Sequence, residues 1–219
     1  ANAAWAVLFS HVARLWEEGD KRGAMFMLET SYKAIALTII TFTILLYTTS
    51  PWWINILFEK YRHGLLYLSG LFTFFLTVSN LTMLTIPAKL HERPIVIALG
   101  ALAGAVANAV LAAFLMPSWG EVGAARAAGV GMFFGGGLVM LIYLLASKTR
   151  LQDSTYFVLG TPVLLLLPPQ YIGPLWAIVL PVCVFSPWIF GANEKAVLSN
   201  VIRKGMQSLQ RILPWKESP

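Results

Sequence analysis

Charged residues are scarce in this chain, and their scarcity excludes an ordinary water-soluble domain. Only 12% of its 219 residues are charged, against about 25% in average soluble domains. Hydrophobic residues make up 58%, and the mean hydropathy is +0.70. Such a composition cannot cover a surface that faces water, so the sequence predicts an integral membrane protein. The net charge of +6 then bears on orientation in the membrane, and we expect no nucleic-acid partner.

Cysteine and the common catalytic motifs are also lacking. The single cysteine, Cys183, excludes internal disulfides and paired-cysteine metal sites, and its apolar surroundings favour an inert core thiol. There is no HExxH motif, nucleophile elbow or phosphate-binding glycine loop. The histidines, His11, His63 and His91, fall at expected helix ends or in loops. The sequence therefore predicts no enzyme, no catalytic residue, no metal ligand and no cofactor.

The chain also lacks an initiator methionine and a signal peptide. Residues 1–15 resemble the last turns of an apolar helix. We expect a fragment of a longer protein. A complete small membrane subunit with no transport of its own is the alternative.

Long apolar runs, by contrast, are abundant. A spanning helix needs about 20 mostly apolar residues, and proline, glycine or charge bounds four such runs. They cover residues 31–50, 64–87, 94–117 and 123–146. Prolines divide residues 155–190 into two shorter runs, which we interpret as bent helices, although residues 155–168 also fit half of a re-entrant hairpin.

The predicted fold class is therefore all-α, a polytopic membrane helix bundle. About six transmembrane helices accompany a partial N-terminal helix and a C-terminal amphipathic helix. Residues 1–190 would form the membrane lobe and residues 191–219 a basic tail.

Positive charge alternates between the connecting segments. One set of connections, together with Lys33, holds thirteen of the sixteen lysines and arginines, and the other holds Lys60, Arg62 and Arg126. Cytoplasmic loops carry the excess of lysine and arginine. The first set and the C-terminus are thus predicted to be cytoplasmic, and the multi-pass chain is expected in a bacterial inner membrane.

The tail has a helical pattern of its own. Apolar residues recur at steps of mostly three or four among basic ones, and they are Leu198, Val201, Ile202, Met206, Leu209 and Ile212. Such a helix suits the surface of an anionic membrane leaflet. Packing on the cytoplasmic end of the protein itself is the alternative.

Four polar residues lie within or beside the expected spans, and they are Lys33, Asn80, Asn108 and Arg126. All ten carboxylates fall at expected ends or in connections, so these cations have no intramembrane acid to neutralise them. The four residues are candidates for a substrate cavity that would suit a phosphate-bearing ligand. The alternative is that the cations extend to the headgroups and the amides join helices.

Small residues recur at every fourth position on the third and fourth runs. They are Gly100, Gly104, Asn108 and Ala112 on the third, and Gly123, Ala127, Gly131 and Gly135 on the fourth. Such stripes let helix backbones approach closely. We expect a tight antiparallel pair joined by the turn between the two runs.

The stretch NAVLAAFLMPSWGEVGAARAA resembles a signature of polysaccharide and oligosaccharide flippases, which share a superfamily with MATE-type multidrug exporters. The residues that fit are Asn108, Leu115, Met116, Pro117, Gly120, Gly123, Ala124 and Ala125. The segment LFSHVARLWEEGDKRGA resembles a cytoplasmic corner of the same family.

The resemblance implies the C-terminal lobe of a flippase that moves a lipid-linked oligosaccharide, of the polyprenyl-diphosphate type, for polysaccharide or O-antigen assembly. Its expected partners are that substrate, membrane lipids and an N-terminal lobe. A MATE-like drug antiporter is the alternative, although such proteins usually rely on intramembrane acids.

Overall fold

The computed structural model describes residues 2–57, 59–149, 151–200 and 203, which are helical almost throughout and contain no strand. Chain order is α1 (Asn2–Glu17), α2 (Lys21–Leu57), the 3-10 segment η1 (Glu59–Gly64), α3 (Leu65–Leu90), α4 (Pro94–Gly131), the π-helical segment η2 (Met132–Gly136), α5 (Gly137–Ala146), α6 (Asp153–Gly160), the 3-10 segment η3 (Thr161–Leu166) and α7 (Pro169–Phe185). Residues 192–200 form a further helix, here called the tail helix. The all-α prediction is confirmed.

The corner between α1 and α2 follows from two residues. Gly19 takes a φ of 89°, a left-handed conformation that suits glycine. The Asp20 side chain then accepts a hydrogen bond of 2.8 Å from the Gly23 backbone N–H. An aspartate at this position satisfies a free N–H of the new helix and complements its dipole.

The prolines do not end the helices, so three predicted boundaries were wrong. Helix α2 continues through Pro51, α3 through Pro87, and α4 through Pro117. Pro51 has no N–H to bond the carbonyl of Tyr47, but the Ser50 hydroxyl donates to that carbonyl at 2.7 Å. Membrane helices tolerate proline in this way because nearby hydroxyls satisfy the freed backbone groups.

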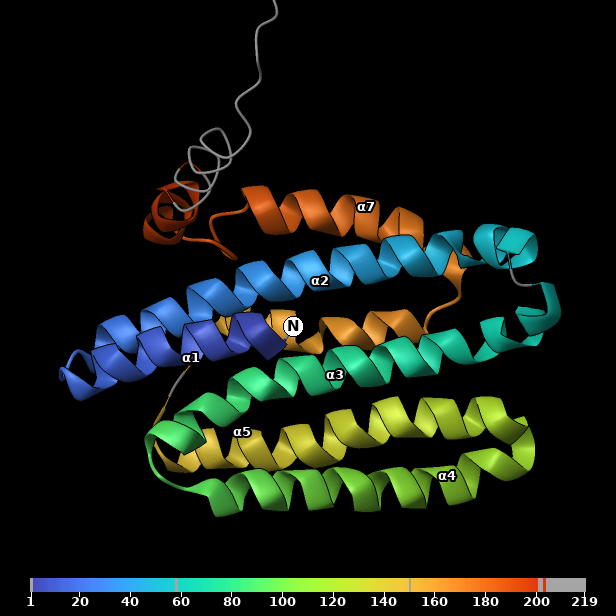
Figure 1. The fold of residues 1–219 in the computed structure, drawn as a ribbon, viewed down its shortest axis with the longest axis horizontal. Coiled ribbons are helices and arrows are strands. Elements are labelled where there is room, and N and C mark those ends of the chain that lie inside the picture. The colour runs from blue at the N-terminus through green and yellow to red at the C-terminus, as the bar shows by residue number, and fades with distance from the viewer. Residues whose placement is uncertain (1, 58, 150, 201–202, 204–219) are drawn as a thin grey trace, which may run out of the picture.

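Helix α4 reverses direction at Gly120, which has a φ of 55° and a ψ of −138°. The two arms of this hairpin, residues 94–119 and 121–146, run antiparallel (Figure 1). The second arm includes the π-helical segment η2 and then α5. The sequence did not predict the π-helical segment. The turn predicted between the two runs is confirmed, with Gly120 as its pivot.

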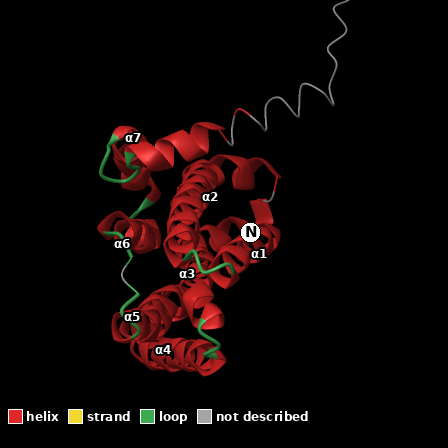
Figure 2. Ribbon diagram, turned by 90° about the vertical axis from the view of Figure 1, so that its left-hand side faces the viewer, coloured by secondary structure: helices red, strands yellow, loops and turns green. Residues whose placement is uncertain are grey.

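The helices lie in layers, and successive connections alternate between the two ends of the bundle (Figure 1). The α1–α2 corner, the α3–α4 turn and the end of α5 share one end. The α2–α3 connection, the Gly120 turn and the start of α7 share the other. Viewed along the bundle, the hairpin lies on one side of α3, and α2, α6 and α7 lie on the other (Figure 2). The basic connections therefore gather at one end, as predicted.

Three helical stretches are long and apolar enough to span a membrane, namely Lys21–Leu57, Arg62–Leu90 and Pro94–Ala146. The last of these contains both arms of the hairpin. Segments Asp153–Leu166 and Pro169–Phe185 are shorter apolar helices, and η3 together with Pro174 and Pro181 makes them irregular, as expected. The chain is a membrane protein built as a helical bundle.

The described part of the basic tail packs on the protein. Leu198 of the tail helix contacts the buried core, and Glu194 is itself buried. This contact favours the second interpretation of the tail for residues 194–200. The remaining apolar positions of the predicted amphipathic helix, Val201, Ile202, Met206, Leu209 and Ile212, lie outside the described residues.

Candidate functional site

Lys33 lies in the interior of the bundle, and every one of its polar contacts comes from a distant part of the chain. Its ammonium pairs with Glu194 Oε1 at 2.6 Å. It also donates to Gln152 Oε1 at 2.9 Å, to Ser154 Oγ at 3.2 Å and to the carbonyl of Ile189 at 2.8 Å. These oxygens replace water around the charge.

Two expectations for Lys33 are therefore wrong. Its side chain does not extend towards a headgroup region, because it is fully buried inside the protein. Its charge is also not without an acid, because the start of the tail helix brings Glu194 against α2. The sequence did not show this pairing, since 160 residues lie between the two partners along the chain.

Glu29 completes what we call the buried charge cluster, defined as Glu29, Lys33 and Glu194. Glu29 lies four residues before Lys33, so both side chains share one face of α2. Its Oε2 accepts hydrogen bonds from the Gln152 backbone N–H at 3.0 Å and from the Thr155 hydroxyl at 2.9 Å. The cluster thus joins α2, the start of α6 and the tail helix.

Glu194 accepts hydrogen bonds at both carboxylate oxygens. Thr30 donates its hydroxyl to Oε1 at 3.1 Å, and the Gly191 backbone N–H donates to Oε2 at 2.9 Å. Sequence reasoning placed Glu29 outside a span and Glu194 in a surface tail, so both carboxylates were missed. The spacing of Glu29 and Lys33 was the one available signal, because it puts opposite charges on one helix face.

A polar hollow of about 290 Å³ lies beside the cluster. Gln152, which is exposed, and Glu194 both form part of its wall. Its lining is Phe26, Gln152, Pro187, Trp188, Gly191, Ala192, Asn193 and Glu194. The hollow provides a polar route from the surface to one carboxylate of the cluster.

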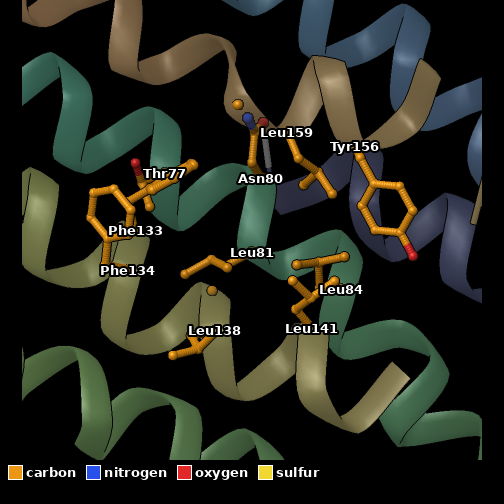
Figure 3. A pocket seen from close by; sticks show the side chains of 12 residues that line it. Thr77, Asn80, Leu81, Leu84, Phe133, Phe134, Leu138, Leu141, Tyr156 and Leu159 are labelled. Atoms are coloured by element: carbon orange, nitrogen blue, oxygen red, sulfur yellow. The ribbon is translucent and has the colours of Figure 1, made fainter. Parts of the chain in front are cut away.

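Asn80 lies in the wall of a different cavity, between α3, the second arm of the hairpin and α6 (Figure 3). This cavity holds about 360 Å³ and is lined mainly by apolar side chains, with Thr77 and Tyr156 as further polar residues. The buried Thr77 hydroxyl has no hydrogen-bond partner among the described residues. A ligand in this cavity would meet an apolar surface with a few polar groups.

Asn108 belongs to the contact between the arms of the hairpin. A Cβ atom added to Gly131 would lie 2.5 Å from the Asn108 backbone, and one added to Gly123 would lie 2.5 Å from the carbonyl of Leu115. These pairs lie at nearly equal distances from the Gly120 turn, as in an antiparallel hairpin. The tight pairing predicted from the small residues is confirmed.

The second arm also packs closely on α3 through its other face. Gly70 lies against the backbone of Ala125, and a Cβ atom added to Gly129 would lie 2.9 Å from the Thr73 side chain. The arm is therefore held between α3 and the first arm (Figure 1).

Arg126 lies near the Gly120 turn, at the end of the bundle away from the cluster. Its guanidinium sits over the Trp119 ring, 5.0 Å from the ring centre. Its Nε is buried and has no hydrogen-bond partner among the described residues. The nearby Glu121 instead accepts a hydrogen bond of 2.7 Å from Tyr67.

The structure thus distributes the four predicted cavity residues over different places. Lys33 is in the buried charge cluster, Asn80 is in a cavity wall, Asn108 is at a helix contact and Arg126 is on Trp119. Of the four, only Asn80 lines the apolar cavity.

Cys183 is buried, as predicted for a core thiol. Within the described residues, no three histidine, cysteine, aspartate or glutamate side chains are grouped to hold a metal ion. Comparison of the chain with protein-family models, curated proteins and solved structures gives no match.

Proposed function

We propose that this chain is a transport lobe of the flippase type, which moves a lipid-linked oligosaccharide between membrane leaflets by alternating access. The supporting observation is the apolar cavity with Asn80 and Thr77 in its wall. Both residues lie in the middle third of α3 (Leu65–Leu90). The middle of a spanning helix lies near the middle of the membrane, where membrane transporters commonly bind substrate.

The character of the cavity fits an amphipathic molecule. Leucine and phenylalanine side chains offer a surface for a lipid chain, while the Thr77 hydroxyl and the Asn80 amide offer hydrogen bonds. The hairpin supports the same proposal, since its Gly120 pivot lies within the segment that resembles the flippase signature. In this proposal the basic end of the bundle and the tail are cytoplasmic, the membrane is a bacterial inner membrane, and a second lobe completes the pathway.

Export of polysaccharide by cells that depend on the parent gene tests the proposal. The double variant Thr77→Val and Asn80→Leu should reduce export at least tenfold, because a buried polar group of the substrate would lose its partners. The matched control is Thr82→Val, since the Thr82 hydroxyl already bonds the Val78 carbonyl of its own helix. Unchanged export by the double variant, with normal protein levels, would reject the cavity as the substrate path.

A MATE-like drug antiporter is the second candidate, and one observation favours it. Such proteins usually rely on acids within the membrane, and Glu29 and Glu194 are buried beside Lys33. The sequence had shown no acid within an expected span, and that absence was the reason to disfavour this class. Efflux of cationic drugs from cells with the parent gene, together with normal polysaccharide export in its absence, would select the antiporter.

A further inference from the structure

The buried charge cluster is not electrically balanced by its own side chains. Glu29, Lys33 and Glu194 expose only 4%, 0% and 3% of their surface. With every group ionised, two carboxylates and one ammonium leave a net negative charge in the interior. An unbalanced buried charge is strongly disfavoured, so such a group normally takes up a proton or binds a cation.

The contacts show which carboxylate carries the excess. Lys33 is in direct contact with Glu194, which also accepts two further hydrogen bonds. Both bonds to Glu29 reach Oε2, and no described group donates to its Oε1. The charges that act on Glu29 are Lys33, which attracts, and Glu194, which repels.

We propose that the buried charge cluster is a proton-binding site in which Glu29 carries one exchangeable proton on Oε1. The proton forms an O–H bond with this oxygen and is released to water as hydronium, without any redox step. In the protonated state the cluster is neutral, with the Lys33–Glu194 ion pair beside an uncharged Glu29 carboxyl. The groups at the start of α6 that face Glu29 are the Gln152 backbone N–H and the Thr155 hydroxyl, and both are uncharged.

The polar hollow supplies the path for exchange. Glu194 and Gln152 lie in its wall, and the Gln152 backbone N–H contacts Glu29 directly. A proton that enters the hollow therefore reaches Glu194, which is one member of the cluster. The site is separate from the apolar cavity of Asn80, and the inference does not depend on the transported substrate.

Release of the proton has a structural consequence. Two ionised carboxylates would then repel one another across the contact between α2 and the tail helix. The tail helix should consequently bind α2 more weakly as the proton leaves, which links proton occupancy to the position of this helix.

Infrared spectroscopy of the full chain in detergent micelles tests the site, because a protonated carboxyl has its own C=O stretching band. At pH 7 we expect one such band in the wild type. Glu29→Gln should remove it, whereas the control Glu121→Gln should keep it, since Glu121 is exposed and bonds only Tyr67. The absence of a band at pH 7, or a band that survives Glu29→Gln, would overturn the proposal.

A variant that removes the positive charge provides a second test. Lys33→Met takes away the only positive charge of the cluster, so both carboxylates should bind protons and the band should double. Adding Glu29→Gln to that variant should restore a single band. An unchanged band in Lys33→Met would contradict the charge balance that underlies the site.

Two further measurements keep the test decisive. If the variants lose their helical circular dichroism, the wild type is transferred to D₂O instead. An exchangeable proton at the site should be replaced by deuterium, and the carboxyl band should shift within the exposure time. Loss of the band on adding NaCl, but not choline chloride, at constant pH would identify a sodium site and overturn the assignment to a proton. None of these readouts depends on polysaccharide export, so a failure here is distinguishable from a failure of the proposed function.

Discussion

The α4–α5 hairpin and the buried charge cluster hold helices together by opposite means. In the hairpin, backbones approach so closely that a Cβ atom at Gly131 would lie 2.5 Å from the Asn108 backbone. In the cluster, long side chains from α2 reach the start of α6 and the tail helix through an ion pair and hydrogen bonds. The hairpin joins neighbours in the sequence, whereas the cluster joins segments more than 100 residues apart.

This difference has an energetic cause. Two lipid-facing helices gain no hydrophobic free energy from association within a membrane, so close packing of small residues has to hold them. The cluster gains from charge pairing but must overcome the desolvation of three ionisable groups. The hairpin should therefore respond mainly to changes of volume, and the cluster mainly to changes of charge.

The largest effect is expected for Lys33→Met. It removes the ion-pair partner of Glu194, whose buried carboxylate must then take up a proton, and breaking such a pair costs about 3–5 kcal/mol. The free energy of unfolding in a detergent titration should fall by that amount. The double variant Lys33→Met with Glu194→Gln should recover part of the loss, because a neutral amide at position 194 needs no proton. Equal stability of wild type and Lys33→Met would show that the cluster does not hold the tail helix.

A volume change should separate two glycines of the second arm. Gly131→Ala places a methyl group 2.5 Å from the Asn108 backbone, and relief of that overlap should cost about 1–3 kcal/mol of unfolding free energy. Gly137→Ala is the matched control, since its nearest neighbour is the Leu81 side chain at 3.7 Å. Similar losses for both variants would argue against close backbone packing as the basis of the hairpin.

The turn itself should depend on backbone conformation and not on space. Gly120 and Gly64 have no neighbour within 4 Å of an added Cβ, but only Gly120 has a positive φ, at 55°. Gly120→Ala should cost about 1–3 kcal/mol, because a φ of 55° together with a ψ of −138° is open almost only to glycine. Gly64→Ala should change the unfolding free energy by much less. Equal losses of unfolding free energy in the two variants would show that the positive φ of Gly120 does not determine the turn.

The smallest effect concerns a polar contact at the basic end. His91 contacts Trp16 edge-on and shares a hydrogen bond of 2.8 Å with the Tyr143 hydroxyl. Burial, and then the charges of Lys21 and Arg93, lower the pKa of His91 below its ordinary value. The unfolded chain therefore binds more protons than the folded one, so the stability from neutral His91 is present above pH 6.5 and is lost as pH falls through this lowered pKa.

Unfolding titrations between pH 5 and pH 8 check the histidine. The wild type should lose stability towards acid, and His91→Gln should show a smaller slope. An identical slope in both proteins would assign the acid dependence to other groups.

Much of the fold follows from the order of residues alone. Runs of apolar residues long enough to span a membrane predicted α2, α3 and both arms of the hairpin. Small residues at every fourth position predicted that the arms pair. These features are local, since each depends on residues within one helix or on two helices joined by a short turn. The helix ends predicted at prolines were the exception. Helix α2 continues through Pro51, because the Ser50 hydroxyl donates to the carbonyl that Pro51 leaves free.

What the sequence by itself determined is the membrane character of the chain, the alternation of its connections and the hairpin around Gly120. The tertiary structure alone decided the environment of each polar residue. Lys33 looked like an unpaired cation until folding brought Glu194 to it, and Asn80 and Asn108 looked equivalent although only Asn80 lines a cavity. The physical reason is that a buried charge is stabilised by whichever groups the fold places within contact, and those groups lie far away along the chain.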